Sequence, residues 1–125
     1  MTWISRYNSK TYGVIAFYKE HVDNTIFCEF DEKFNIINSW KFPKKVLSRL
    51  KPWSVSGGFV KNGYIYASGH DKGEIYILHI KDDKNILELL EIIDVKSSGQ
   101  GVSYHNNNLF VIHRKKKQVI EYEFI

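Results

Sequence analysis

Side chains that could do chemistry occur as two adjacent pairs in the sequence. His70 and Asp71 lie in a polar turn, and His113 and Arg114 come together further along. An imidazole beside a carboxylate can supply ligands to a divalent ion, or a general base with an orienting acid. A simpler interpretation is also open, in which Asp71 caps its own turn and His70 is a solvated neighbour. Which interpretation holds depends on the elements that position these residues.

The segment from Trp53 to Ile80 predicts three antiparallel strands. Asn62-Gly63 separates residues 56–61 from residues 64–68, and Asn-Gly is the strongest short signal for a β-hairpin. The polar turn at 70–73 then leads into residues 74–80, where apolar side chains occupy both alternating faces. We expect that strand to be buried on two sides.

A second copy of this pattern follows in residues 101–124, 44 positions later, and residues 13–42 give a looser third copy. The shift places Gly57 on Gly101, Tyr66 on Phe110 and Ile75 on Val119. A period of about 40 to 50 residues in an all-strand pattern is typical of propeller blades. The strands expected are 14–18, 25–30, 35–42, 54–61, 64–69, 74–80, 87–95, 102–105, 109–113 and 118–124. One helical turn is expected within 43–52.

The paired segments SGGFVKNGYIYASGHDKGEIYILHI and SGQGVSYHNNNLFVIHRKKKQVIEYEF resemble the β-propeller repeats of the quinoprotein-like and NHL-like group. They are similar to stretches in uncharacterised bacterial propeller proteins. The resemblance implies an all-β fold of about three four-stranded antiparallel meander blades in an incomplete ring. The blades would span 1–42, 53–95 and 97–125 of a single partial domain, 1–125. The shared signal is architectural, not catalytic.

Meander topology predicts where a ligand would bind. The loops between the second and third strands of each blade share one side of the disc with the connections between blades, and function generally resides on such loops. The candidate ligand-binding residues on that side are His21, Trp53, His70, Asp71, Gln100, His113 and Arg114. The leading hypothesis is a noncatalytic module that binds a small molecule or a protein, as the C-terminal part of a longer propeller or by itself.

An enzyme is the second hypothesis, as a metal-assisted hydrolase or lactonase-like fragment. Lactonase-type propellers hold a metal with side chains from several blades, but no such set of Glu, Asn and Asp maps onto this sequence. No catalytic residue, metal site or cofactor is assigned. The chain also has no Gly-x-Ser-x-Gly and no Gly-x-x-x-x-Gly-Lys motif.

A basic surface is the third hypothesis, since the net charge is +4 and the pI about 9.1. Residues that could bind a polyanion on the same side are Lys44, Lys45, Arg114, Lys115, Lys116 and Lys117. A basic turn also keeps a hairpin soluble and protects a sheet edge. Aromatic residues for base stacking are limited to Trp53, which argues against nucleic acid.

The remaining features concern solubility and assembly. No apolar run approaches the roughly 20 residues of a membrane span, and MTWISRYNSK lacks the apolar centre of a signal peptide. We expect a soluble protein, cytoplasmic by default, whose single cysteine, Cys28, is a buried thiol. Three blades leave two apolar flanks, expected at Trp3, Trp40 or Phe42 and at Tyr122 or Phe124. Either missing blades or a second copy would cover them, and Trp3–Arg6 would begin the first blade or complete the last.

Overall fold

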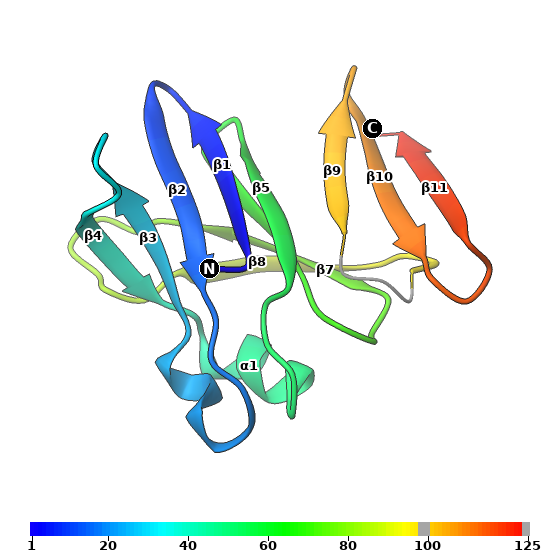
Figure 1. Cartoon of the computed structure of the whole chain (residues 1–125), viewed down its shortest axis with the longest axis horizontal. Helices are drawn as coiled ribbons and strands as arrows, with labels where there is room; N and C mark the ends of the chain where they lie inside the picture. The colour runs from blue at the N-terminus through cyan, green and yellow to red at the C-terminus, as the bar shows by residue number, and fades with distance from the viewer. Residues whose placement is uncertain (98–100, 124–125) are drawn as a thin grey trace.

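The computed structural model describes residues 1–97 and 101–123, and antiparallel strands dominate it (Figure 1). The first sheet holds β1 (Trp3–Tyr7), β2 (Lys10–Ile15), β3 (Ile26–Phe30) and β4 (Ile36–Lys41). The second holds β5 (Gly57–Lys61), β6 (Tyr64–Ser68), β7 (Glu74–His79) and β8 (Glu88–Asp94). The third holds β9 (Val102–His105), β10 (Asn108–His113) and β11 (Gln118–Glu123). Strands pair in chain order within each sheet, so the all-β meander class predicted from the sequence is confirmed.

The first hairpin of each sheet closes through a two-residue turn. Asn62 and Gly63 have φ values of 51° and 80°, as the predicted turn requires, and Asn8-Ser9 is built in the same way. The second strand of the first sheet therefore begins earlier than predicted. It was expected to start at 14, but Tyr7 already pairs with Lys10. Asn8 tolerates the positive φ of the turn well, and Ser9 adopts it too, so the turn closes at once.

Trp3–Tyr7 thus forms the first strand of the first sheet and does not complete the third. It pairs along its length with β2, from Trp3 opposite Val14 to Tyr7 opposite Lys10. The prediction that β2 extends to residue 18 is also wrong, since it ends at Ile15. Beyond it the chain enters the short 3-10 helix η1 (Lys19–Asn24).

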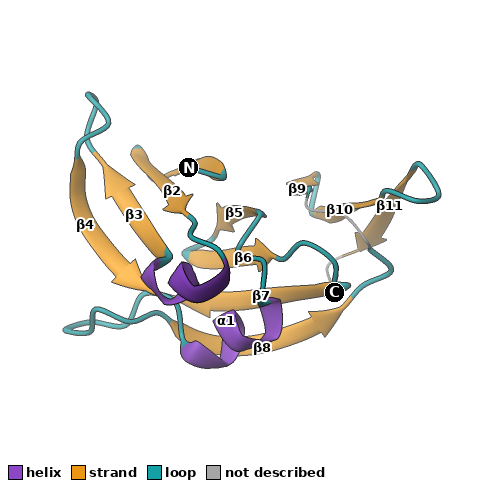
Figure 2. Ribbon diagram, turned by 60° about the horizontal axis from the view of Figure 1, so that its bottom comes forward, coloured by secondary structure: helices purple, strands orange, loops and turns teal. Residues whose placement is uncertain are grey.

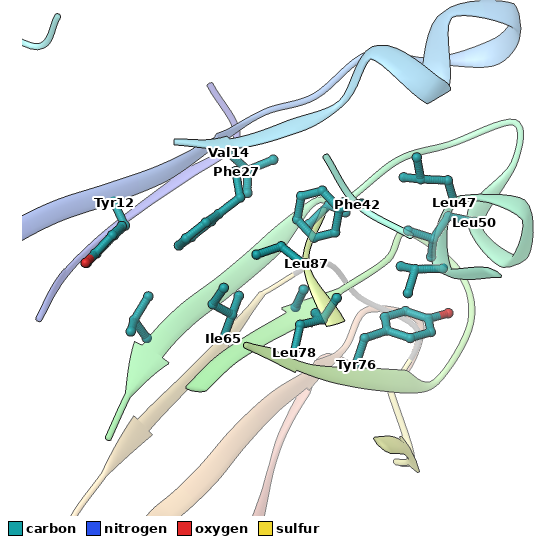
Figure 3. Close-up of a cluster of buried hydrophobic side chains, with 14 of the residues drawn as sticks. Tyr12, Val14, Phe27, Phe42, Leu47, Leu50, Ile65, Tyr76, Leu78 and Leu87 are labelled. Atoms are coloured by element: carbon teal, nitrogen blue, oxygen red, sulfur yellow. The ribbon is translucent and has the colours of Figure 1, made fainter. Parts of the chain in front are cut away.

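The three sheets pack face to face, with the second in the middle (Figure 2). One of its faces contributes Val60, Ile65 and Leu78 to a cluster with the first sheet, which Figure 3 shows in close-up. Its other face contributes Phe59 and Ile75 to a smaller cluster with the third sheet. Strand β7 is therefore buried on both sides, as its sequence predicted.

The connection between the first two sheets contains the helix α1 (Lys44–Leu50), longer than the single turn expected. Its residues Val46, Leu47 and Leu50 are buried, and Figure 3 shows Leu47 and Leu50 near Tyr76. Phe42 precedes the helix and is also buried, at 3% exposure. The prediction that Phe42 lies on an open flank is therefore wrong, because it belongs to the buried cluster between the first and second sheets.

The other aromatic residues assigned to open flanks also differ from expectation. Trp3 and Trp40 share a register row with Phe27, and both pack against the cluster between the first and second sheets. Tyr122 packs against the cluster between the second and third sheets. Phe124 lies outside the described residues. Other residues are exposed on the two outer faces, among them Ile4 on the first sheet and Val119 on the third.

Strands β1 and β5 lie beside one another, and so do β5 and β9. The hairpin turns that join first and second strands lie at one end of the sheets, and η1 and α1 lie at the other (Figure 1). The three sheets fall within the ranges 1–42, 53–95 and 97–125 inferred from the repeat. Among the described residues, no helix has the length and apolar character needed to cross a membrane.

Candidate functional site

Trp53, His70, Asp71 and Arg114 form one contiguous group at the end of the sheets that carries α1. The indole of Trp53 stacks on the imidazole of His70, with ring centroids 4.4 Å apart and planes inclined by 20°. His70 Nδ1 lies 2.6 Å from Asp71 Oδ1. Arg114 Nη2 donates to the same carboxylate oxygen at 3.1 Å and to the carbonyl of His70 at 3.4 Å. Residues from three separate segments are therefore joined here.

The local structure explains why these side chains meet. Trp53 follows α1, and its amide donates to the carbonyl of Leu50 at 2.9 Å, which closes the end of the helix. The loop after β6 packs tightly on the same helix, since a Cβ at Gly69 would overlap the Leu50 side chain. Arg114 lies in the turn between β10 and β11. Its contact with Asp71 links the equivalent loops of two neighbouring sheets.

Charge in this group is largely paired. The hydrogen bond from His70 lowers the pKa of the Asp71 carboxyl below its ordinary value, with smaller contributions from Arg114 and Trp53. If Nδ1 of His70 carries the proton donated to Asp71, Nε2 is left as an acceptor. The imidazole is held between the indole and the carboxylate, and about a fifth of its side chain is exposed. The group is a fixed platform of aromatic and ionic side chains.

A small hollow of about 140 Å³ opens beside this platform. Its lining residues are Arg49, Leu50, Lys51, Pro52, Trp53, His70, Asp71 and Lys72. The lining among the described residues thus holds three cations and no hydroxyl or thiol side chain. Such a surface suits an anionic ligand with a flat apolar part better than covalent catalysis, which needs a positioned nucleophile.

Arg49 is already paired, and sequence reasoning missed its partner. Arg49 Nε donates to Glu74 Oε1 at 3.2 Å, and Arg49 Nη2 contacts Glu74 Oε2. The hydroxyl of buried Tyr76 also donates to Glu74 Oε1, at 3.0 Å. The hydrogen bond from Arg49 lowers the pKa of Glu74, and burial raises the pKa of Tyr76. A charged residue within the apolar run EIYILHI was the available signal for such a pair.

A second hollow lies on the other side of the loop between β6 and β7, where the second and third sheets meet. Its lining residues are Gly73, Val95, Lys96, Ser97, His113, Lys116, Gln118 and Ile120. Within it, the amide of Lys116 donates to His113 Nδ1 at 3.3 Å, which fixes Nδ1 of that ring as an acceptor. His113 therefore lies near the platform but lines a different hollow.

The remaining candidates are dispersed. His21 lies on η1, exposed, with its Nε2 3.6 Å from Glu20, and it joins neither hollow. Gln100 lies outside the described residues. Lys44 lines a separate apolar depression with Phe42 and Leu47. The described structure thus brings together Trp53, His70, Asp71 and Arg114 of the predicted set.

The basic candidates also divide into two groups. Lys44 and Lys45 begin α1, whereas Lys115, Lys116 and Lys117 are exposed on the turn that follows Arg114. Within residues 1–97 and 101–123, no group of three or more His, Cys, Asp or Glu side chains is placed to hold a metal ion. The distinctive chemistry of this end is cationic and aromatic.

No protein family, curated protein or solved structure matches the chain.

Proposed function

We propose that the protein is a noncatalytic binding module that holds a small organic anion on the platform formed by Trp53, His70, Asp71 and Arg114. The observation that carries the proposal is the stacked Trp53–His70 pair beside a hollow lined by Lys51 and Lys72. Trp53 is 40% exposed, so a flat ligand can lie against the indole surface that His70 leaves open. The lysines then neutralise the ligand's anionic group.

The platform is built before any ligand arrives. Arg114 holds Asp71, Asp71 holds His70, and Arg49 is held by Glu74, so little rearrangement is needed on binding. Asp71 does not repel an anion strongly, because its carboxylate is hydrogen-bonded to His70 and paired with the charge of Arg114. The geometry therefore favours recognition by preformed surfaces.

The wider architecture in this proposal is that of a β-propeller. Three meander sheets support it, with their first strands adjacent, their faces in contact, and a repeat of 44 positions between the second and third. In a propeller the loops at one end of the blades form a common binding surface. The platform joins such loops from the second and third sheets.

Calorimetric titration with sodium benzoate tests the proposal, since benzoate combines a flat ring with one carboxylate. We expect a dissociation constant on the order of 1 mM and no binding of the neutral analogue benzyl alcohol. Lys72→Gln should weaken binding by a factor of roughly two to five, as loss of one exposed charge does. Lys84→Gln, in the turn between β7 and β8, is the matched control and should bind as the wild type does. Equal binding of benzoate and benzyl alcohol would contradict the proposal.

A further inference from the structure

Two sheet faces in the described structure carry exposed apolar side chains. On the first sheet, the face turned away from the second exposes Ile4, Ile36 and Ile37, at 48% to 52%. On the third sheet, the face turned away from the second exposes Ile112 at 40% and Val119 at 69%. These are the flanks that the sequence predicted, with different residues on them. Exposed apolar faces on stacked sheets mark places where another surface packs.

The exposed face of the third sheet corresponds to a covered face of the second. A shift of 44 positions superimposes the register rows of the third sheet on those of the second. The row Ser103, Phe110 and Glu121 falls on the row Phe59, Tyr66 and Ile77. In the second sheet this face is covered by the third sheet, and the Phe59 ring lies 4.9 Å from the Tyr104 ring. The third sheet therefore presents a face of the kind that accepts a neighbour.

The exposed face of the first sheet corresponds to the opposite face of the second. Aligning the turns Asn8-Ser9 and Asn62-Gly63 superimposes their hairpins. The row Arg6, Thr11 and Phe30 then falls on the row Val60, Ile65 and Leu78. That row of the second sheet is covered by the first sheet. The two outer faces, each with exposed apolar side chains, thus correspond to the two halves of a contact that the chain already makes twice.

The charges on the two faces are of opposite sign. Glu121 and Glu123 lie on the exposed face of the third sheet, and Arg6 and Lys41 lie on that of the first. The internal contact predicts how the two faces meet. Tyr104, which packs on Phe59, corresponds to Val60 and hence to Arg6, whereas Phe59 corresponds to Ser103. Ser103 would therefore face Arg6, with Glu121 two strands further along the row of Ser103. The acidic face of the third sheet would thus meet the basic face of the first, and charge complementarity of this kind selects and orients a partner.

We infer that the partner is a second copy of this chain, bound head to tail, with the third sheet of each copy on the first sheet of the other. Two such contacts related by a two-fold axis cover both faces of both copies. Two copies would together form a ring of six sheets, and this part of the inference rests on the propeller interpretation. It is independent of the ligand, because the benzoate platform contains none of these residues.

Sedimentation equilibrium of the full chain measures the assembly directly. We expect a mass of twice 14.7 kDa at micromolar concentrations. Val119→Lys should raise the dimer dissociation constant at least about tenfold, because it buries a charge in an apolar contact. Val119 is so exposed that this change leaves the core of each copy intact. Asp82→Lys, in the turn between β7 and β8, is the control and should sediment as the wild type does.

Charge exchange tests the head-to-tail geometry. Glu121→Arg puts a positive charge on the face of the third sheet that meets Arg6 and Lys41, and Arg6→Glu puts a negative charge on the face of the first sheet that meets Glu121 and Glu123, so each variant alone should dissociate more readily than the wild type. An equal mixture should reassociate, since every contact between unlike copies then joins opposite charges. A wild-type monomer at all concentrations, or variants that remain apart when mixed, would overturn the inference. Benzoate titration of monomeric Val119→Lys would show separately whether the ligand site stands.

Discussion

The indole of Trp3, on the first sheet, lies directly over Gly58 of the second. A Cβ at residue 58 would stand 2.6 Å from two ring carbons of Trp3, and equally close to the carbonyl oxygen of Tyr66. Trp3 sits in the register row that also contains Phe27 and Trp40. The absence of a side chain at Gly58 is therefore what lets the two sheets approach, and it fixes where the first strands lie beside one another.

Gly58→Ala should lower the free energy of unfolding by roughly 1 to 3 kcal/mol, because the backbone oxygen of Tyr66 cannot move aside without breaking strand pairing. Chemical denaturation measures this. The matched control is Gly101→Ala, where the new Cβ would meet only the flexible end of the Ile112 side chain. Similar losses in the two variants would mean that the close approach of Trp3 and of the Tyr66 carbonyl to Gly58 does not determine the packing.

The pair formed by Arg49 and Glu74 should make stability depend on pH. The pKa of Glu74 is lowered in the folded protein, chiefly by Arg49, so unfolding at low pH takes up a proton. The stabilisation is fully present above the ordinary pKa of about 4.5, and it is lost as the pH falls through the lower folded-state value.

Glu74→Gln should lower the free energy of unfolding at pH 7 by roughly 1 to 3 kcal/mol and flatten its decline below pH 4.5. Denaturant titrations at pH 7 and at successively lower pH measure both effects. Glu32→Gln, at an exposed turn, is the control and should keep the wild-type profile. If the two variants share one profile, the pair does not couple α1 to β7 as argued.

Much of the strand pattern could be predicted because it rests on local turn chemistry. Asn62-Gly63 and the polar turn at 70–73 mark hairpins whatever surrounds them, and the repeat then places β9 to β11. The direction in which a strand faces was harder to predict. Apolar residues occupy both faces of the strands that carry Trp3 and Trp40, so the alternation could not show which set of side chains faces the core.

The site was partly predictable for the same reason. Meander topology brings the loop at His70 beside the turn at Arg114, and the structure joins them. The topology could not predict the pairing of Arg49 with Glu74, since that contact depends on how far α1 folds back over β7. The topology also grouped His21 with the other candidate residues, whereas His21 on η1 lies away from both hollows.

Cys28 offers a test of the core of the first sheet. It is fully buried, and burial raises its pKa to about 11. At pH 8 only about one thiol in a thousand is then ionised, so a thiol-specific disulfide reagent should react far more slowly than with a free thiol. The same protein in guanidinium chloride supplies the comparison. Rapid, complete reaction of the folded protein would show that β3 is open to solvent.

Amide chemical shifts during benzoate titration test whether the platform of Trp53, His70, Asp71 and Arg114 binds a small organic anion. We predict progressive shifts in residues 49–53, 70–73 and 114, saturating at concentrations on the order of 10 mM. Benzyl alcohol should leave those amides unchanged. Shifts confined to other parts of the protein, or no shifts at all at these concentrations, would contradict the account.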